Sequence, residues 1–205
     1  MAITLDTLIS DMLIPSSLSL IGGRVGIGKT SLALTIAEEV AKIQPDKDTV
    51  FFALADDGYS VSLIREKSHE TQNIGLVIVD YLQLMHTGDS QDYSDTLRGL
   101  KLIAHDLAIP VIVLSQVSRA CTEREDKRPK IVDLCEYGFL EQTADIIAFI
   151  HRESYYNPEC ECVHAELIVA KNRTDRQIGT IHLVWDECCM PDVRPLMIPQ
   201  QINKK

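Results

Sequence analysis

Residues 18–31 read LSLIGGRVGIGKTS, and this stretch predicts how the chain folds. A short apolar run at 18–21 predicts a buried strand, and a glycine-rich loop follows it. Beyond the loop, apolar residues recur at helical spacing along one face. The segment 23–30 fits the pattern G-x-x-x-x-G-K-[ST], in the strand–loop–helix context that this motif requires. The sequence therefore predicts a phosphate-binding loop.

The residue types in this loop suit a nucleotide triphosphate. Glycines let successive backbone N–H groups turn toward one anion, and the start of the helix adds its positive dipole end. Lys29 supplies a charge for the β- and γ-phosphates, and Thr30 offers a hydroxyl to Mg²⁺. The alternative is a glycine-rich turn that ends in Lys-Thr by chance, and the flanking strand and helix argue against it. The predicted nucleotide-binding residues are Gly23, Arg24, Val25, Gly26, Ile27, Gly28, Lys29, Thr30 and Ser31.

Length and composition are typical of a single globular domain. The 205 residues suffice for one full core, so we expect one ATPase domain over 1–205, with a lead-in at 1–17 and a tail at 187–205. The net charge of −10 gives no general attraction to nucleic acid, and any such contact needs a local basic loop. We find no secretory signal and no apolar run of membrane-spanning length. A cytoplasmic location with reduced cysteine thiols is therefore expected.

Strand-like and helix-like patterns alternate along the chain. This alternation predicts an α/β fold with a mostly parallel, twisted sheet covered by helices on both faces. The last two strands are joined around 175–179 and predict a late antiparallel hairpin. The expected strands are 18–21, 50–54, 76–79, 111–114, 146–150, 164–170 and 180–185. The expected helices are 5–12, one that follows the phosphate loop and runs to about 43, 60–69 and 95–107.

Two polar residues follow apolar strands of this predicted sheet. Asp80 closes the strand that begins near Gly75, where a carboxylate can hold the water shell of Mg²⁺ beside Thr30. Gln116 follows the fourth strand, at the edge where parallel sheets bind their ligands, and its amide can sense a γ-phosphate. A strand-end capping Asp and an ordinary exposed Gln remain the alternatives.

Five further fragments occur in a fixed order after the phosphate loop. They read IVDYLQLM at 78–85, LSQVSR at 114–119, DKRP at 126–129, EQTAD at 141–145 and AKNR at 170–173. Together these fragments resemble the C-terminal RecA-like motor of DnaB-type replicative helicases. The resemblance covers nearly the whole chain, from about 5 to 185, and implies the RecA-like P-loop NTPase fold.

This resemblance implies a mechanism and partners. The family forms rings of six subunits, binds Mg·ATP between subunits and translocates on single-stranded DNA during replication, often with other replication proteins. It implies that Asp80 is the Walker B acid and that Gln116 is the γ-phosphate sensor. It further implies that Lys171 and Arg173 reach the γ-phosphate held by a neighbouring subunit. An arginine in that place stabilises charge on the transferring group.

The sequence departs from the family pattern at the water-activating residue. The family ends its second strand with a Glu that polarises the attacking water, and Ala55 stands in that place here. Asp56 is the candidate substitute base, with Asp57 as its alternative, but a displaced and shorter carboxylate holds a water less well. The segment 57–73 also leaves room for one helix where the family has several.

A second departure affects the DNA-binding loop. The family reads LRESG where this chain reads LCEYG at 134–138, so a phosphate-contacting Arg is replaced by Cys135. A basic loop nearby supplies alternative contacts, although acidic residues dilute it. The expected DNA-binding residues are Arg119, Arg124, Lys127, Arg128, Glu136 and Gly138.

Three functional hypotheses follow. The first is a reduced helicase motor that couples hydrolysis of Mg·ATP to movement on single-stranded DNA. The second is a nucleotide-dependent regulatory module with little or no hydrolysis, which Ala55 and Cys135 favour. The third is a recombinase or clock-type relative, which should not carry both DKRP at 126–129 and KNR at 171–173.

Overall fold

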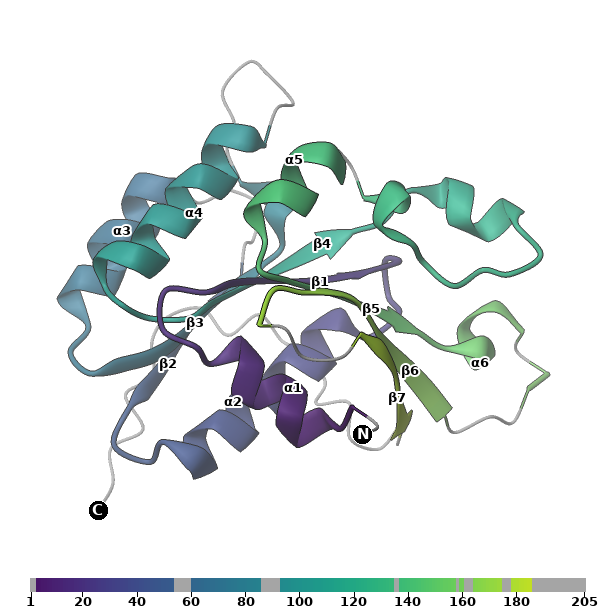
Figure 1. Cartoon of the computed structure of the whole chain (residues 1–205), viewed down its shortest axis with the longest axis horizontal. Coiled ribbons are helices and arrows are strands. Elements are labelled where there is room, and N and C mark those ends of the chain that lie inside the picture. Colours follow the sequence, from purple (N-terminus) through teal and green to yellow (C-terminus); the bar gives the residue numbers. More distant parts are fainter. Residues whose placement is uncertain are drawn as a thin grey trace.

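The computed structural model describes residues 3–53, 60–85, 93–134, 137–157, 159–160, 164–174 and 178–185. Within them the strands form a seven-stranded sheet in the order β2-β3-β4-β1-β5-β6-β7 (Figure 1). The strands are β1 (Leu18–Gly23), β2 (Asp48–Ala53), β3 (Ile74–Asp80), β4 (Val111–Gln116), β5 (Ile146–His151), β6 (His164–Asn172) and β7 (Gly179–Val184). The α-helices are α1 (Leu5–Met12), α2 (Lys29–Ile43), α3 (Val61–Glu70), α4 (Ser94–Asp106), α5 (Tyr137–Thr143) and α6 (Glu153–Tyr156). The 3₁₀ turns are η1 (Leu82–Leu84), η2 (Arg119–Glu123) and η3 (Ile131–Asp133).

Strands β1 to β5 run parallel, and β6 and β7 complete the sheet in antiparallel pairing. The carboxyl ends of β1, β3, β4 and β5 therefore meet at one edge. Gly23 pairs with Gln116 there, so the phosphate loop leaves the sheet beside the end of β4. The end of β6 lies at the opposite edge, because Asn172 pairs with Ile146 at the start of β5.

Alternation along the strands builds two cores, one on each face of the sheet. In β3, Val77 and Val79 belong to one core and Leu76 and Ile78 to the other. Helices α3, α4 and α5 cover the first face, and α1 and α2 cover the second (Figure 1). Helix α4 contributes an apolar set whose helical spacing places it on one buried stripe: Leu97, Leu100, Ile103 and Ala104.

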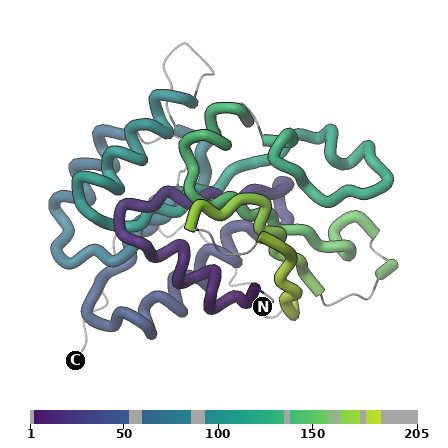
Figure 2. Tube along the Cα trace, in the orientation of Figure 1, coloured from purple at the N-terminus to yellow at the C-terminus, as the bar shows by residue number. Residues whose placement is uncertain are grey.

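The lead-in segment is part of the core. Leu8, Ile9 and Met12 of α1 are at most 1% exposed and pack beneath β5 and β6. Figure 2 shows this first helix beside the last strands of the chain. The side chain of Asn172 there donates a hydrogen bond to Oδ2 of Asp11, at 2.9 Å.

The expected fold is confirmed, including the late hairpin of β6 and β7. The short helices α5 and α6 and the three 3₁₀ turns were not expected from the sequence. The expectation of reduced thiols is wrong for Cys160, which is disulfide-bonded, whereas Cys121 is a free, buried thiol. The tail at 187–205 also lies outside the described residues.

Among the helices that the structure describes, none is both long and apolar enough to cross a bilayer.

Candidate functional site

The phosphate loop joins β1 to α2 at the carboxyl edge of the sheet. The chain turns through Gly26 and Gly28, whose φ angles of 75° and 109° suit glycine and few other residues. Helix α2 begins directly after this turn, at Lys29. Its first backbone N–H groups have no partner within the helix, so this end is suited to bind an anion.

Lys29, Thr30 and Asp80 converge in this loop. The Thr30 hydroxyl donates a hydrogen bond to Oδ2 of Asp80 at 2.5 Å, and the Lys29 ammonium donates to the carbonyl of Arg24 at 2.9 Å. Burial lowers the pKa of Lys29 to about 8, against the opposing effect of the Asp80 charge. Burial also raises the pKa of Asp80, against the hydrogen bond from Thr30. The loop therefore holds a buried cation and a hydroxyl, and the hydroxyl contacts the carboxylate at the end of β3, which fits a phosphate with its metal ion.

The ends of β3 and β4 are connected by Gln83, which the sequence interpretation did not single out. Its amide nitrogen donates to Oγ of Ser115 at 2.9 Å, and its amide oxygen accepts from the backbone N–H of Gln116 at 3.0 Å. Gln116 is half-buried at the end of β4. Gln83 therefore fixes the backbone that carries Gln116 relative to the strand that carries Asp80.

Aromatic side chains flank the loop on its other side, near β5 and β7. The Tyr155 hydroxyl donates to the carbonyl of Val25 at 2.8 Å. A Cβ atom at Gly28 would lie 2.3 Å from Cη2 of Trp185, so this indole touches the loop backbone. The guanidinium of Arg152 lies 4.5 Å from the centre of the Trp185 ring. The loop thus has a polar side toward β3 and β4 and an aromatic side toward β5 and β7.

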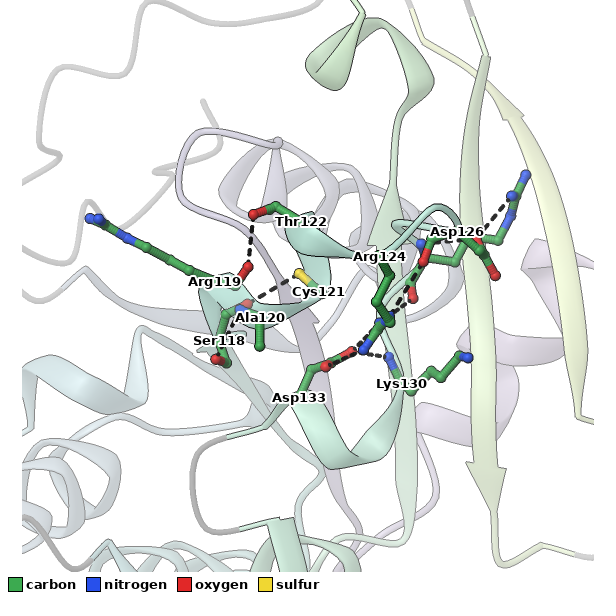
Figure 3. A network of polar contacts seen from close by, with 10 residues as sticks. Ser118, Arg119, Ala120, Cys121, Thr122, Arg124, Asp126, Lys130 and Asp133 are labelled. Atoms are coloured by element: carbon green, nitrogen blue, oxygen red, sulfur yellow. Dashed lines mark hydrogen bonds and ion pairs between the residues drawn. The ribbon is translucent and has the colours of Figure 1, made fainter.

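The segment 118–134 follows β4 and holds all four expected DNA-binding cations, of which Figure 3 labels Arg119 and Arg124. Arg124 donates to both carboxylate oxygens of Asp133, each at 2.7 Å. Arg128 donates to both oxygens of Glu166 on β6, at 2.6 and 2.7 Å. These bidentate pairs lower the pKa of both carboxyl groups and hold two of the four expected cations in internal contacts.

The other two expected cations take no part in these bidentate pairs. Arg119 is exposed and extends away from the polar network in Figure 3, and Lys127 is half-buried. Gly138 is exposed on α5 and has open space where a side chain would begin. Glu136 and Cys135 lie outside the described residues. The DNA-binding roles of all these residues stay predictions.

Lys171 and Arg173 lie at the opposite edge of the sheet from the phosphate loop. The Lys171 ammonium donates to the carbonyl of Glu141 and, at 2.6 Å, to that of Ala144. The guanidinium of Arg173 donates to the carbonyl of Gln142. Because of the strand order and direction, neither side chain reaches the phosphate loop of its own chain.

The structure thus brings one set of expected site residues to a single edge, namely Lys29, Thr30, Asp80 and Gln116, and separates Lys171 and Arg173 from them. Asp56 and Ala55 lie outside the described residues. The residues that the structure describes contain no cluster of three His, Cys, Asp or Glu side chains arranged to bind a metal ion. Thr30 and Asp80 are the pair suited to Mg²⁺ together with a bound phosphate.

Comparison with known proteins agrees with this architecture. A model of the DnaB-like helicase C-terminal domain family matches residues 53–191. The replicative DNA helicase DnaB of Geobacillus stearothermophilus is 42% identical over 135 residues, covering 61% of this chain and 30% of that helicase. The replicative DNA helicase DnaB of Rickettsia bellii is 35% identical over 197 residues, covering 78% of this chain and 39% of that helicase. The chain therefore spans well under half the length of these relatives.

Solved structures show the same relationship. One solved ATPase domain has a TM-score of 0.74 and 31% identity, over 83% of this chain and 81% of that domain. A DnaB-like replicative helicase studied with its primase interactions has a TM-score of 0.77 and 30% identity, over 85% of this chain and 58% of that one. The RadB recombinase matches with a TM-score of 0.58 at 18% identity, a likeness of fold alone.

Proposed function

The chain belongs to the family of DnaB-like helicase C-terminal domains, and from that premise we propose that residues 23–31 bind Mg·ATP. The observation that carries this proposal is the contact between Thr30 on the phosphate loop and Asp80 at the end of β3. A hydroxyl and a carboxylate in contact are the groups that hold Mg²⁺ beside a nucleotide, the carboxylate through water. Lys29 then exchanges its bond to a backbone carbonyl for the β- and γ-phosphates.

The two sides of the loop indicate how the nucleotide lies. Asp80 and Gln116 define the end that receives Mg²⁺ and the γ-phosphate. The nucleoside therefore emerges on the opposite side, toward β5 and β7, where Trp185 and Arg152 provide an aromatic ring and a planar cation. Both groups stack well on a purine base.

Two functions remain for this nucleotide site. The first is a helicase motor that couples hydrolysis of Mg·ATP to movement on single-stranded DNA. It is supported by family membership and by the placement of Asp80 and Gln116 at one edge. The second is a nucleotide-dependent regulatory module with little hydrolysis. It is supported by Ala55 at the position of the water-activating Glu, and by the internal pairing of Arg124 and Arg128.

The positions of Lys171 and Arg173 bear on how subunits would assemble. Lys171 and Arg173 lie at the edge opposite the phosphate loop, so any action on a γ-phosphate has to be on another subunit. This arrangement favours self-association into a ring, in which one edge of each subunit faces the loop of the next.

The sole tryptophan of the chain, Trp185, provides a direct binding assay. Its fluorescence should change on titration with Mg·ATP, because its ring touches the loop. Lys29→Ala should raise the dissociation constant about 10- to 100-fold, the equivalent of one charge-assisted contact to phosphate. Lys67→Ala, which removes a surface lysine of α3, is the control and should bind like the unchanged protein. Equal affinities for the protein and Lys29→Ala would refute the nucleotide site.

Turnover separates the two functions. The motor should hydrolyse ATP faster when single-stranded DNA is present, and the regulatory module should bind ATP with slow turnover that DNA does not change. Ala55→Glu restores the family's carboxylate and is the sharpest comparison. A large gain in turnover supports an otherwise intact motor, whereas no gain favours the regulatory module.

A further inference from the structure

Arg24 belongs to the phosphate loop, but its side chain turns away from the phosphate position. Its Nη1 atom donates a hydrogen bond to the carbonyl of Val117 at 2.8 Å, just beyond the end of β4. The backbone of Val117 returns the contact by donating to the carbonyl of Gly23 at 3.3 Å. The loop is therefore connected to Val117 through both a side chain and a backbone bond.

The backbone of the same arginine contacts Lys29. The carbonyl of Arg24 accepts from the Lys29 ammonium at 2.9 Å and from the Ile27 N–H at 3.3 Å. Arg24 thus contacts the lysine that is expected to bind phosphate on one side and the end of β4 on the other. Its Nε atom is buried and finds no hydrogen-bond partner among the residues that the structure describes.

Val117 directly precedes the segment 118–134, which carries the expected DNA-binding cations. It forms an antiparallel bridge with Leu134, and both residues are at most 3% exposed. The next backbone N–H, of Ser118, donates to the carbonyl of Asp133 at 2.7 Å. These contacts close the segment 118–134 at its base, so a shift of Val117 moves both ends of the segment together.

From this geometry we infer that Arg24 is a positioning residue that transmits occupancy of the phosphate loop to Val117, and so to the segment 118–134. The inference rests on the proposed nucleotide site. When Lys29 turns to a bound phosphate, the carbonyl of Arg24 loses a charged donor and the turn adjusts. The guanidinium carries that adjustment to Val117. This route passes through the backbone of Val117 and does not use the Gln116 side chain.

A guanidinium suits this role because it is planar, permanently charged and able to donate in a fixed direction. The competing explanation is that the Arg24 side chain only stabilises the fold through its bond to Val117. In that case a variant without the guanidinium would be less stable, but nucleotide binding would still change the segment 118–134. The two explanations therefore differ in the response to nucleotide and not in the contact itself.

Hydrogen–deuterium exchange, with and without a nonhydrolysable ATP analogue and Mg²⁺, tests the inference. In the unchanged protein the analogue should protect 23–31 and also alter exchange at Val117, Ser118 and Leu134 by about fivefold or more, the low end for coupled sites. In Arg24→Met, at an analogue concentration that saturates the protection of 23–31 in that variant, the distant change should be lost. Arg24→Lys keeps the charge without the guanidinium, so the same loss is expected. Arg65→Met, which removes an arginine from a surface ion pair of α3, is the matched control and should behave as the unchanged protein.

Three outcomes would overturn the inference. The first is a distant change in Arg24→Met or Arg24→Lys as large as in the unchanged protein, and either variant suffices if the other fails to fold. The second is protection of 23–31 in the unchanged protein with no change at Val117, Ser118 or Leu134. The third is no protection of 23–31 in the unchanged protein, which removes the proposed nucleotide site and this inference with it.

Discussion

At the scale of single residues, the side chains that are expected to bind the nucleotide form hydrogen bonds within the protein instead. Lys29 is 7% exposed and is held by a carbonyl, and Thr30 is held by Asp80. Burial of the Lys29 ammonium is costly, the nearby Asp80 charge offsets only part of that cost, and the pKa is therefore lowered. A phosphate at the same position would raise the pKa of Lys29 again, because its negative charge stabilises the ammonium.

The pKa of Lys29 predicts how nucleotide affinity depends on pH. Only the protonated amine is a charged donor to phosphate, so affinity should be constant below the pKa of about 8 and fall above it. The fall should approach tenfold per pH unit, because binding then requires the uptake of one proton. Titration of Trp185 fluorescence with Mg·ATP between about pH 6.5 and 9.5 measures this effect.

Lys29→Met is the control for this pH profile, because it removes the titrating amine. Its weaker binding should show no fall above pH 8 from this group. The assignment would be wrong if the unchanged protein and Lys29→Met lost affinity in parallel as the pH rises.

Gly28 is constrained by both its backbone and its neighbour. Its φ of 109° costs an L-residue roughly 1–2 kcal/mol, and a Cβ atom would collide with Trp185. Gly28→Ala should therefore lower the free energy of unfolding in urea by at least that amount and shift the emission of Trp185. Gly138→Ala adds a Cβ in open space, and in the same unfolding measurement it should leave stability unchanged or raise it. Equal stability of Gly28→Ala and the unchanged protein would contradict the close contact with the indole.

The sequence predicts some of these residues and misses others for a physical reason. Lys29, Thr30 and Asp80 belong to patterns with fixed spacing, because phosphate and metal geometry dictates where such groups must stand. Trp185 belongs to no such pattern, and the fragment at 78–85 that contains Gln83 does not show what its side chain binds. Their positions follow from which strands end side by side, and that information is absent from a local pattern.

At the scale of elements, the segment 118–134 is organised by two bidentate ion pairs. Arg124 pairs with Asp133 inside the segment, and Arg128 pairs with Glu166 on β6. The carboxylates occupy the donors that a phosphate backbone would use. Composition alone suggests a basic loop here, but the paired structure leaves fewer charges available.

Glu166→Gln should make Arg128 more available for single-stranded DNA, because its guanidinium then keeps only the longer contact to the Asp126 carboxylate, at 3.3 Å. We expect higher affinity in low salt, and a slope of log K against log salt that is steeper by about 0.7, the value for one added phosphate contact. Fluorescence anisotropy with a labelled oligonucleotide over a series of salt concentrations measures both quantities. Glu70→Gln removes a carboxylate from a surface pair with Lys67 on α3 and is the charge-matched control. An unchanged slope in Glu166→Gln would show that Arg128 is not a DNA contact.

Long elements follow from the sequence more faithfully than short ones. The strands and the helices α2 and α4 have several periods of apolar residues, so their pattern predicts them. Helices α5 and α6 have 7 and 4 residues, too few to display a period. Their formation depends on tertiary contacts, such as the Lys171 ammonium at the carbonyl end of α5.

At the scale of the whole molecule, the antiparallel end of the sheet separates the two halves of the expected catalytic machinery. Asp145 lies at this far edge, directly before β5. Its carboxylate accepts a hydrogen bond from the Leu18 N–H at the start of β1, at 2.8 Å, and one from the Lys101 ammonium of α4, at 2.5 Å. Arg173 lies 3.5 Å from the same carboxylate. The far edge is thus braced within the chain, and its cations cannot swing to their own phosphate loop.

This separation makes a prediction for mixed assemblies. If turnover needs Arg173 from a neighbour, then Arg173→Ala and Lys29→Ala should each be inactive alone and regain activity when mixed. An intact phosphate loop then meets an intact Arg173 at about a quarter of the interfaces in an equal, random mixture of a head-to-tail ring. Turnover of the mixture should therefore approach about a quarter of that of the unchanged protein.

A double variant, Lys29→Ala with Arg173→Ala, is the control for this experiment. Mixed with Arg173→Ala it should restore nothing, because no interface then contains Arg173. Light scattering with and without nucleotide should show self-association whenever turnover is measurable. An active monomer, or an active unchanged protein whose two variants fail to rescue each other, would contradict action between subunits. The position of Arg173 on its own Gln142 carbonyl would then be its whole role: closing the end of α5, with no part in hydrolysis.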